Sequence, residues 1–337
     1  MLWKLILKIY SMAKKKIPSL PKLLQSKIYK TGQTRGADDD VIFQNRVNRN
    51  STVLIPYDFY EISRTAPDND GVFENGFIVL INPTFYFTTE NINDILTSKG
   101  LSLGENCLLF YETRKEWNEF NPITKNLVLA QSRINPLGGH YVARVPSTTS
   151  ANDEKLNLGY NTTSLKGAGI RIYEYASSQI IKNTQIQLEF LFWQCVDSHQ
   201  VALEAGMTEE NIILRKESIF EICAERKLSE IGLLQANRMI DKENNTICPL
   251  CMEKLKGMGF LSRLSQAEGR AVPDLTVTEI NLFHIRELRI GEFNHKPYNL
   301  GWGHHHCNVV CKDSGIIDTL KWMKSVTDKN IAEGIVF

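Results

Sequence analysis

Features of membrane and secreted proteins are missing from this sequence of 337 residues. No apolar run approaches the length of a transmembrane helix, and the apolar N-terminus, MLWKLILKIYSM, is interrupted by Lys4 and Lys8. This terminus also lacks the small-residue cleavage site of a signal peptide. We expect it to form an amphipathic helix, or to be an extension ahead of a start near Met12. With 42% hydrophobic and 23% charged residues, the composition is that of a globular protein.

Acidic residues are missing from the first 37 positions, where nine lysines and arginines lie. Such a basic arm suits an anionic polymer such as DNA, although a solvated terminus has the same composition. The loop 30–36 and the stretch 44–50 add side chains that either hydrogen-bond base edges or simply form polar turns. The predicted DNA contacts in these two segments are Lys30, Arg35, Arg46 and Arg49.

Cysteines are too scarce outside one segment for a disulfide framework. Four of the seven lie from Cys248 to Cys311, together with five of the seven histidines. An odd number of cysteines with metal-like spacing favours a reducing compartment, so we expect a cytoplasmic protein. Cys195 and Cys223 lie in apolar helical patterns and are predicted to be buried, unreactive thiols.

A structural zinc site is predicted in the cysteine-rich segment. Cys248 and Cys251 form a CPLC knuckle, which is the usual half of such a site. Two alternatives supply the other half, because Cys307 shares a helix face both with His304 at i−3 and with Cys311 at i+4. The predicted zinc ligands are therefore Cys248, Cys251 and Cys307, with either His304 or Cys311 as the fourth.

The pattern of apolar residues predicts a protein of the α+β class. Strands are expected at 51–56, 76–81, 106–111 and 167–175, and helices at 178–206 and 208–240, with Thr208 as an N-cap. Alternation from Ile186 to Phe190 also leaves a strand open there. A polar break at 241–246 separates a mixed β-rich and helical domain, 1–240, from a smaller domain, 241–337. In the smaller domain we expect strands at 276–284 and 298–300, then a helix from about 303 to 313 that Gly315 stops.

The smaller domain resembles the HNH, or ββα-metal, nucleases. The motifs that carry the resemblance are Cys248-x-x-Cys251, His284-Ile285, Asn299-Leu300 and His304-x-x-Cys307-Asn308. In this register His304 stands where the family has a cysteine ligand, which makes it the preferred fourth ligand over Cys311. The resemblance covers residues 248–325 and implies a zinc-containing ββα-metal nuclease domain. The larger domain, 1–240, is then expected to recognise DNA and to mediate dimerisation.

The resemblance also assigns the catalytic roles. It implies that His284 is the general base, that Asn299 holds the loop and orients His284, and that Asn308 is a ligand of a catalytic Mg²⁺. A neutral histidine accepts a proton near pH 7, and a divalent cation stabilises the leaving oxygen. Taken singly, these residues also have an ordinary structural explanation. A lone histidine is usually a core or surface residue, and an asparagine in a loop usually belongs to a turn.

One position departs from the family. Phe283 stands where the family has an Asp or His as a second metal ligand, so another group has to complete the site. The candidates are His295, His306, Glu287 and Asp313. Further basic residues expected to contact DNA phosphates are Arg286, Arg289 and Lys312. Trp302 and Trp322 are expected in the core of the small domain.

Two segments, KIYKTGQTRGADDD (27–40) and NLGWGHHHCNVV (299–310), resemble the BstXI-type restriction endonucleases. This implies a type II enzyme that hydrolyses double-stranded DNA at a specific sequence. It further implies a homodimer on an interrupted palindrome, each subunit cutting one strand, because the two-fold symmetry of the protein mirrors that of the site. A cognate DNA methyltransferase acting on the same sequence is the expected partner.

Three alternatives stay open. A PD-(D/E)xK nuclease is suggested by Pro67-Asp68 and by Asp153-Glu154-Lys155, which lie in polar, loop-like surroundings. A non-catalytic reader of DNA or of modified bases is suggested by Phe283. A homing or repair HNH nuclease differs from a restriction enzyme in the DNA that it cuts, and no motif of the chain separates the two.

Overall fold

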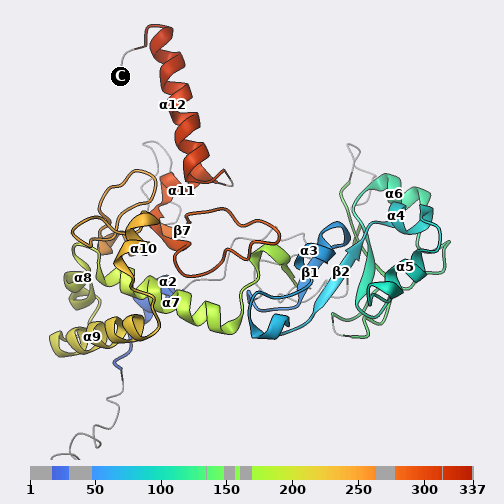
Figure 1. The fold of residues 1–337 in the computed structure, drawn as a ribbon, viewed down its shortest axis with the longest axis horizontal. Helices are drawn as coiled ribbons and strands as arrows, with labels where there is room; N and C mark the ends of the chain where they lie inside the picture. Colours follow the sequence, from blue (N-terminus) through green and yellow to red (C-terminus); the bar gives the residue numbers. More distant parts are fainter. Residues whose placement is uncertain are drawn as a thin grey trace, which may run out of the picture. The chain divides into compact units, whose positions relative to one another are not determined.

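A computed structural model of the protein describes residues 17–29, 48–133, 135–147, 156–159, 169–262, 278–312 and 314–335. Across these residues, no helix has the length and apolarity to cross a membrane. The chain divides into two compact units (Figure 1). Unit 1 comprises residues 1–30, 183–285 and 300–337, and unit 2 comprises 31–182 and 286–299. This division differs from the predicted boundary at 240/241, because residues 183–240 cluster with the C-terminal segment.

Unit 2 contains a six-stranded sheet with the order β5-β4-β3-β2-β1-β6. The strands are β1 (Val53–Pro56), β2 (Phe77–Ile81), β3 (Cys107–Tyr111), β4 (Tyr141–Val145), β5 (Leu156–Leu158) and β6 (Ile170–Arg171). All neighbours pair in parallel except β4 and β5. Three predicted strands are confirmed as β1, β2 and β3. The fourth, 167–175, is mostly wrong, because a 3-10 turn, Ile172–Glu174, carries the chain out of β6.

The two faces of this sheet are covered differently. The helices and turns of unit 2 are η1 (Tyr57–Phe59), α3 (Tyr60–Ser63), η2 (Asn69–Gly71), α4 (Pro83–Thr88), α5 (Ile92–Ser98) and α6 (Arg114–Glu119). Alternate strand residues face opposite sides, so Val53 and Ile55 pack with Leu96 of α5, whereas Leu54 packs with Leu137 of a loop on the other side. Helices therefore cover one face, and loop residues cover part of the other.

Unit 1 is mainly helical. Its helices before the small domain are α2 (Lys22–Ile28), α7 (Ser178–Trp193), α8 (Ser198–Glu204), α9 (Glu209–Glu225) and α10 (Ile231–Ala236), with a 3-10 turn η4 (Gly257–Phe260); the start of α7 belongs to unit 2. The two long predicted helices are each broken. Asp197 leaves the helix to accept hydrogen bonds from the backbone N–H groups of Gly257 and Met258, and Lys227 has a positive φ. Thr208 is confirmed as the N-cap of α9.

The predicted state of two cysteines is confirmed. Cys195 and Cys223 are both buried. Burial raises the pKa of Cys223 to about 12 and raises that of Cys195 further. Both side chains are therefore protonated thiols at neutral pH, as expected for inert core residues.

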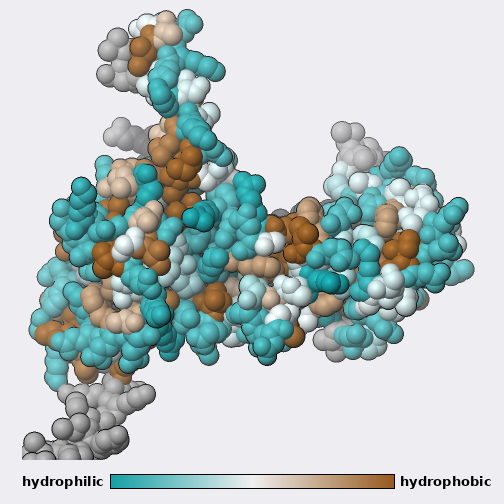
Figure 2. All heavy atoms as spheres, viewed as in Figure 1, coloured by the Kyte–Doolittle hydropathy of each residue, from teal (hydrophilic) through white to brown (hydrophobic). Residues whose placement is uncertain are grey.

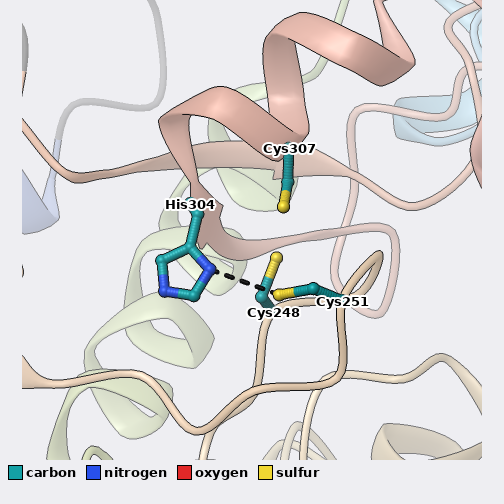
Figure 3. Close-up of side chains that lie close together, drawn as sticks. All are labelled: Cys248, Cys251, His304 and Cys307. Carbon is teal, nitrogen blue, oxygen red and sulfur yellow. Dashed lines mark hydrogen bonds between the residues drawn. The ribbon is translucent and has the colours of Figure 1, made fainter. Parts of the chain in front are cut away.

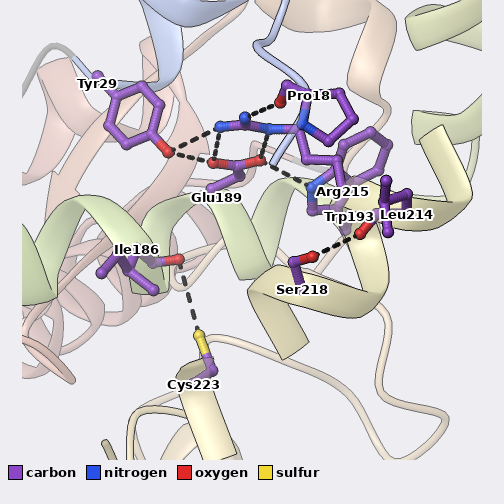
Figure 4. A network of polar contacts seen from close by, with 9 residues as sticks. All are labelled: Pro18, Tyr29, Ile186, Glu189, Trp193, Leu214, Arg215, Ser218 and Cys223. Carbon is purple, nitrogen blue, oxygen red and sulfur yellow. Dashed lines mark hydrogen bonds and ion pairs between the residues drawn. The ribbon is translucent and has the colours of Figure 1, made fainter. Parts of the chain in front are cut away.

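A buried ion pair joins α7, α9 and the N-terminal segment (Figure 4). Arg215 donates two hydrogen bonds to the carboxylate of Glu189, with N···O distances of 2.6 and 2.8 Å. Trp193 Nε1 and the hydroxyl of Tyr29 donate to the same carboxylate, and the carbonyl of Pro18 accepts from Arg215. Burial and the charge of Glu189 raise the pKa of Tyr29, which keeps its hydroxyl a donor. The segment 17–29 is thus tied into unit 1 by fully paired charges.

Residues 280–311 follow the expected order of strand, loop, strand and helix. β7 (Ile280–His284) pairs antiparallel with β8 (Leu300–His304), and α11 (His305–Cys311) packs against both strands. Trp302 is buried as predicted, and its Nε1 donates to the carbonyl of Leu188 at 2.9 Å. Gly315, with φ of 76°, ends this part, but a further helix α12 (Ile316–Ala332) follows. Trp322 lies on α12 with 59% of its surface exposed, so its predicted burial is wrong.

We expect Arg215→Ala to lower the free energy of unfolding by about 3–5 kcal/mol, because it leaves the fully buried Glu189 without its counter-charge. Arg226→Ala is the control, since Arg226 is exposed at the end of α9, and should cost less than about 0.5 kcal/mol. Urea unfolding followed by tryptophan fluorescence measures both. Equal effects would show that the buried pair does not stabilise unit 1.

Candidate functional site

Four metal-binding side chains converge in unit 1 (Figure 3). One ligand atom each from Cys248, Cys251, His304 and Cys307 lies within 4.8 Å of the other three. A tetrahedral zinc ion with bonds of about 2.3 Å to sulfur needs ligand atoms roughly 3.8 Å apart. The cluster is close to that spacing, and three cysteines with one histidine are a common set for structural zinc. The residues present therefore fit a zinc ion.

The first half of the cluster is a tight hairpin. Its residues Ile247 and Lys254 form a bridge, and Met252, with φ of 65°, donates its N–H to the carbonyl of Cys248 at 2.9 Å. Arg238 donates from Nε to the carbonyl of Pro249 at 2.6 Å, inside the CPLC sequence. The sequence analysis missed Arg238, because its partners are backbone carbonyls that leave no side-chain pattern.

The second half lies where β8 turns into α11. His304 is the last residue of β8 and the N-cap of α11, so its side chain and that of Cys307 face the knuckle from one helical turn. The backbone N–H of His305 donates to the carbonyl of Glu279 at 2.8 Å, which holds this turn against the chain before β7. Cys311 is buried one turn further along α11 and is not part of the cluster. Of the two predicted ligand sets, the structure assembles the one with His304.

The electrostatics of the cluster suit a cation. Cys251 Sγ lies 3.3 Å from Nδ1 of His304. Burial raises the pKa values of Cys251 and Cys307, and burial together with His306 lowers that of His304. A neutral imidazole is the form that binds metal, whereas the thiols need a cation nearby to become thiolates. Metal binding would thus relieve the cost of burying these groups together.

His284 is the last residue of β7 and pairs with Leu300 of β8. Its side chain is half-buried. The preceding residue, Phe283, is only 1% exposed, and a Cβ placed on Gly303 would lie 2.5 Å from its ring. Neighbouring strand residues point to opposite faces, so Phe283 packs in the core on the side away from His284. Phe283, the residue that departs from the family pattern, therefore packs in the core.

Asn299 closes the loop between the two strands. Its Oδ1 accepts from the N–H of Arg286 at 2.7 Å, and its Nδ2 donates to the carbonyls of Arg286 at 2.9 Å and Asn294 at 2.7 Å. Asn299 is buried, so these bonds are shielded from water. The loop that begins two residues after His284 is thus held at both ends by one side chain.

The remaining candidates for the catalytic cation are dispersed. Asn308 is half-buried on α11. His306 is exposed, and its ring stacks on His304 with centroids 5.2 Å apart, while His295 is buried in unit 2. Glu287 is half-buried in unit 2, and Asp313 lies outside the described residues. Within the part of the chain that the structure describes, no second group of three His, Cys, Asp or Glu side chains converges.

The predicted DNA-binding residues fall into three classes. Arg286, Arg289 and Lys312 are exposed, as a phosphate contact requires. Lys30, Arg35 and Arg46 lie outside the described residues. Arg49 is 5% exposed, and it donates to the carbonyl of Glu174 at 3.1 Å. Burial lowers the pKa of Arg49 to about 10. Its buried guanidinium is not available to DNA, which corrects the prediction for this residue.

Comparison with known proteins places the chain in a family. The family model described as BstXI restriction endonuclease matches residues 26–305. The chain belongs to the BstXI restriction endonuclease family. This confirms the resemblance seen in its two sequence segments and supports a site-specific deoxyribonuclease.

A solved structure described as a type II restriction endonuclease is similar in part. The alignment has a TM-score of 0.28 and 14% identity, and it covers 50% of this chain and 59% of that chain. The chain thus spans little more than half the length of that protein. No curated protein sequence matches the chain.

We expect the purified protein to contain one zinc ion per chain, measured by inductively coupled plasma mass spectrometry. Cys307→Ala should lower zinc affinity by more than about 100-fold. Loss of a residue that hydrogen-bonds to a metal ligand typically costs about 10–100-fold in affinity, and loss of the ligand itself should cost more. Cys311→Ala is the matched control, since Cys311 is also buried on α11 but lies outside the cluster. Zinc lost equally from both variants would contradict the ligand set.

Proposed function

We propose that this protein is a type II restriction endonuclease that cleaves double-stranded DNA at a specific sequence with a ββα-metal site. The observation that carries the proposal is the Cys/His cluster, which ties the knuckle to the junction of β8 and α11. That junction belongs to the same β7–β8–α11 element that bears His284 and Asn308. Membership of the restriction endonuclease family supports the reaction, and the ββα arrangement supports the mechanism.

In the proposed mechanism His284 accepts a proton from the attacking water. It stands half-buried at the end of β7, and an imidazole is the side chain best suited to accept a proton near pH 7. Asn299 holds the loop that follows and so restrains the backbone next to His284. Arg286 and Arg289 on that loop are exposed and suited to bind the phosphates flanking the scissile bond.

Asn308 would supply an amide oxygen to Mg²⁺, which stabilises negative charge on the phosphate and leaving oxygen when it is bound. Magnesium sites in nucleases commonly use few protein ligands, with substrate phosphate and water completing the octahedron. Asn308 would be one neutral ligand, so the phosphate oxygens of the substrate would supply the negative charge at the ion. Zinc has a different role in this proposal, because four protein ligands leave it no open coordination position and make it structural.

We also propose a homodimer, with α12 at the contact between two copies. After its first turn, α12 is almost entirely exposed, and Figure 2 shows hydrophobic side chains along part of it. One side of the helix carries no charge over its whole length; it is formed by Ile316, Thr319, Leu320, Trp322, Met323, Val326, Thr327, Asn330 and Ile331. A second copy suits this face, because a neutral face meets its symmetry mate without repulsion. Two copies would also supply one active site for each DNA strand.

The proposal extends to the setting of the enzyme. A site-specific nuclease endangers the DNA of its own cell, so a methyltransferase that modifies the same sequence is its natural partner. The cytoplasm is the compartment that suits its free thiols.

The rival PD-(D/E)xK site gains little support, since Asp68 accepts a hydrogen bond from Ser177, and residues 153–155 lie outside the described residues. The rival DNA reader keeps its main support, because the buried Phe283 supplies no ligand to a catalytic cation.

With Mg²⁺ and phage-sized DNA, we expect the wild-type protein to yield discrete fragments on a gel. His284→Ala should reduce the cleavage rate by about 10²–10⁴-fold, the usual contribution of a general base, while retaining its zinc. His199→Ala is the control, because His199 is exposed on α8 and pairs with Glu209. A smear in place of bands would argue for a less specific HNH nuclease. DNA bound but left intact would favour the non-catalytic reader.

In light scattering after gel filtration, we expect the wild type at twice the 38.4 kDa chain mass. Met323→Glu places a charge at the centre of the neutral face of α12 and should weaken the dimer by at least about tenfold. Ser325→Glu makes the same change in charge on the opposite side of the helix and should leave the mass unchanged. A monomeric wild type, or equal effects of the two variants, would contradict a dimer through α12.

A further inference from the structure

A pocket of about 360 Å³ lies at the carboxyl-terminal edge of the parallel sheet in unit 2. Its lining comes from the ends of β1, β2 and β3 and from β6. Because β1 has β2 on one side and β6 on the other, the strand order reverses at β1. Open sheets with parallel strands bind ligands outside the carboxyl ends of their strands, beside such a reversal. The position and the volume of the pocket are therefore those of a ligand site.

Three strands build this pocket in the same way. Each contributes a buried apolar side chain to the floor, followed two or four residues later by a polar one at the edge. The pairs are Leu54 on β1 and Asp58 in η1, Leu80 on β2 and Asn82 directly after it, and Phe110 on β3 and Glu112 directly after it. The three floor residues belong to one buried cluster on a single face of the sheet. The pocket therefore combines a dry floor with polar groups at its mouth.

Aromatic rings form a further wall. Tyr57 and Phe85 both line the pocket, and their ring centroids are 4.9 Å apart with the planes inclined by 32°. Tyr173 lines it from the turn after β6. Flat apolar walls of this kind favour a flat ring, which gains stacking energy without requiring one particular base.

The charged side chains at the mouth of the pocket indicate which polar groups a bound ring should carry. Arg171 is the neighbour of Leu54 in the β1–β6 register, so the guanidinium lies on the pocket face of the sheet. Asp58 and Glu112 are exposed carboxylates on the same lining. Two carboxylates against one guanidinium disfavour a phosphate group. They favour a neutral ring whose amino group donates to a carboxylate and whose ring nitrogen or carbonyl accepts from arginine.

The edge of the pocket is held rigidly. Asn82 Oδ1 accepts from the N–H of Phe85 at 3.2 Å, and its Nδ2 donates to Glu116 Oε1 at 2.6 Å. Glu116 Oε2 accepts from the backbone N–H groups of Glu112 at 3.2 Å and Thr113 at 3.0 Å. The ends of β2 and β3 are thus joined through one buried carboxylate, which fixes the backbone that bears Glu112.

We propose that this pocket binds a nucleobase carrying an exocyclic amino group, either turned out of a DNA duplex or as a free nucleoside. The base would lie over Leu54, Leu80 and Phe110, with its amino group toward Asp58 or Glu112. The duplex source rests on the proposed nuclease function, whereas the binding of a free nucleoside does not. Ile290 also lines the pocket and belongs to the loop that Asn299 closes, so an occupied pocket would touch the segment next to the proposed active site.

The test uses the full-length protein without added Mg²⁺, so that DNA is bound but not cut. In one arm, cytidine, guanosine, adenosine and thymidine are titrated separately by calorimetry. In the other, a duplex carries 2-aminopurine in a mismatch, whose fluorescence rises when the base leaves the stack, and a terminal dye reports total binding. Asp58→Asn and Glu112→Gln are compared with Glu105→Gln, an exposed carboxylate at the amino end of β3.

The proposal expects the three amino-bearing nucleosides to bind more tightly than thymidine, and Asp58→Asn or Glu112→Gln to weaken them by about tenfold, the loss of one good hydrogen bond. A rise in 2-aminopurine fluorescence that these variants lose, at equal total binding, identifies a base turned out of DNA. Nucleoside binding without that rise identifies the free nucleoside as the ligand. Three results would overturn the proposal. The first is that thymidine binds as tightly as the other nucleosides. The second is that no nucleoside binds and 2-aminopurine fluorescence does not rise, and the third is that this fluorescence rises equally in all variants. DNA cleavage measured separately with Mg²⁺ distinguishes each result from a failure of the nuclease function.

Discussion

The Cys/His cluster is the constraint on which the small domain depends. β7, β8 and α11 are short elements, and a metal bound by the cluster would cross-link their junction to the knuckle and keep them in one arrangement. The cluster joins the knuckle at Cys248 to the start of α11 at His304, and both halves are also held by backbone hydrogen bonds. Where α11 begins thus decides where Asn308 stands relative to the end of β7.

The hairpin of this element connects two parts of the chain. Its strands belong to unit 1, whereas the loop 286–299 belongs to unit 2. In that unit the ring of Phe293 contacts Phe73 in a tilted arrangement and Tyr175 edge to face, with ring centroids 6.3 Å apart in both pairs. Asn299 closes the same loop by bonding to Arg286. The chain between the two strands is therefore packed against the core of unit 2.

Local patterns predicted the elements whose stability is mainly local or whose apolar runs are continuous. β1, β2 and β3 are buried on both faces and read as unbroken apolar runs, and the N-cap at Thr208 is a contact within one turn. The helices after residue 178 were predicted as too long, since the turn at Asp197 depends on the backbone of Gly257 far along the chain. α12 was missed because the prediction ended its last helix at Gly315 and assigned no element to the rest of the domain 241–337.

By itself the sequence determined the metal-binding residue types, their spacing and the family, because these are properties of short segments. The family register already favoured His304 over Cys311 as the fourth ligand, although both lie at helical spacing from Cys307. The tertiary structure placed His304, and not Cys311, beside the knuckle. It likewise turned Phe283 into the core and buried Arg49, because burial depends on neighbours far away in the sequence. The pocket in unit 2 is also a feature that only the tertiary structure decides, because the carboxyl ends of separate strands meet only when the sheet has formed.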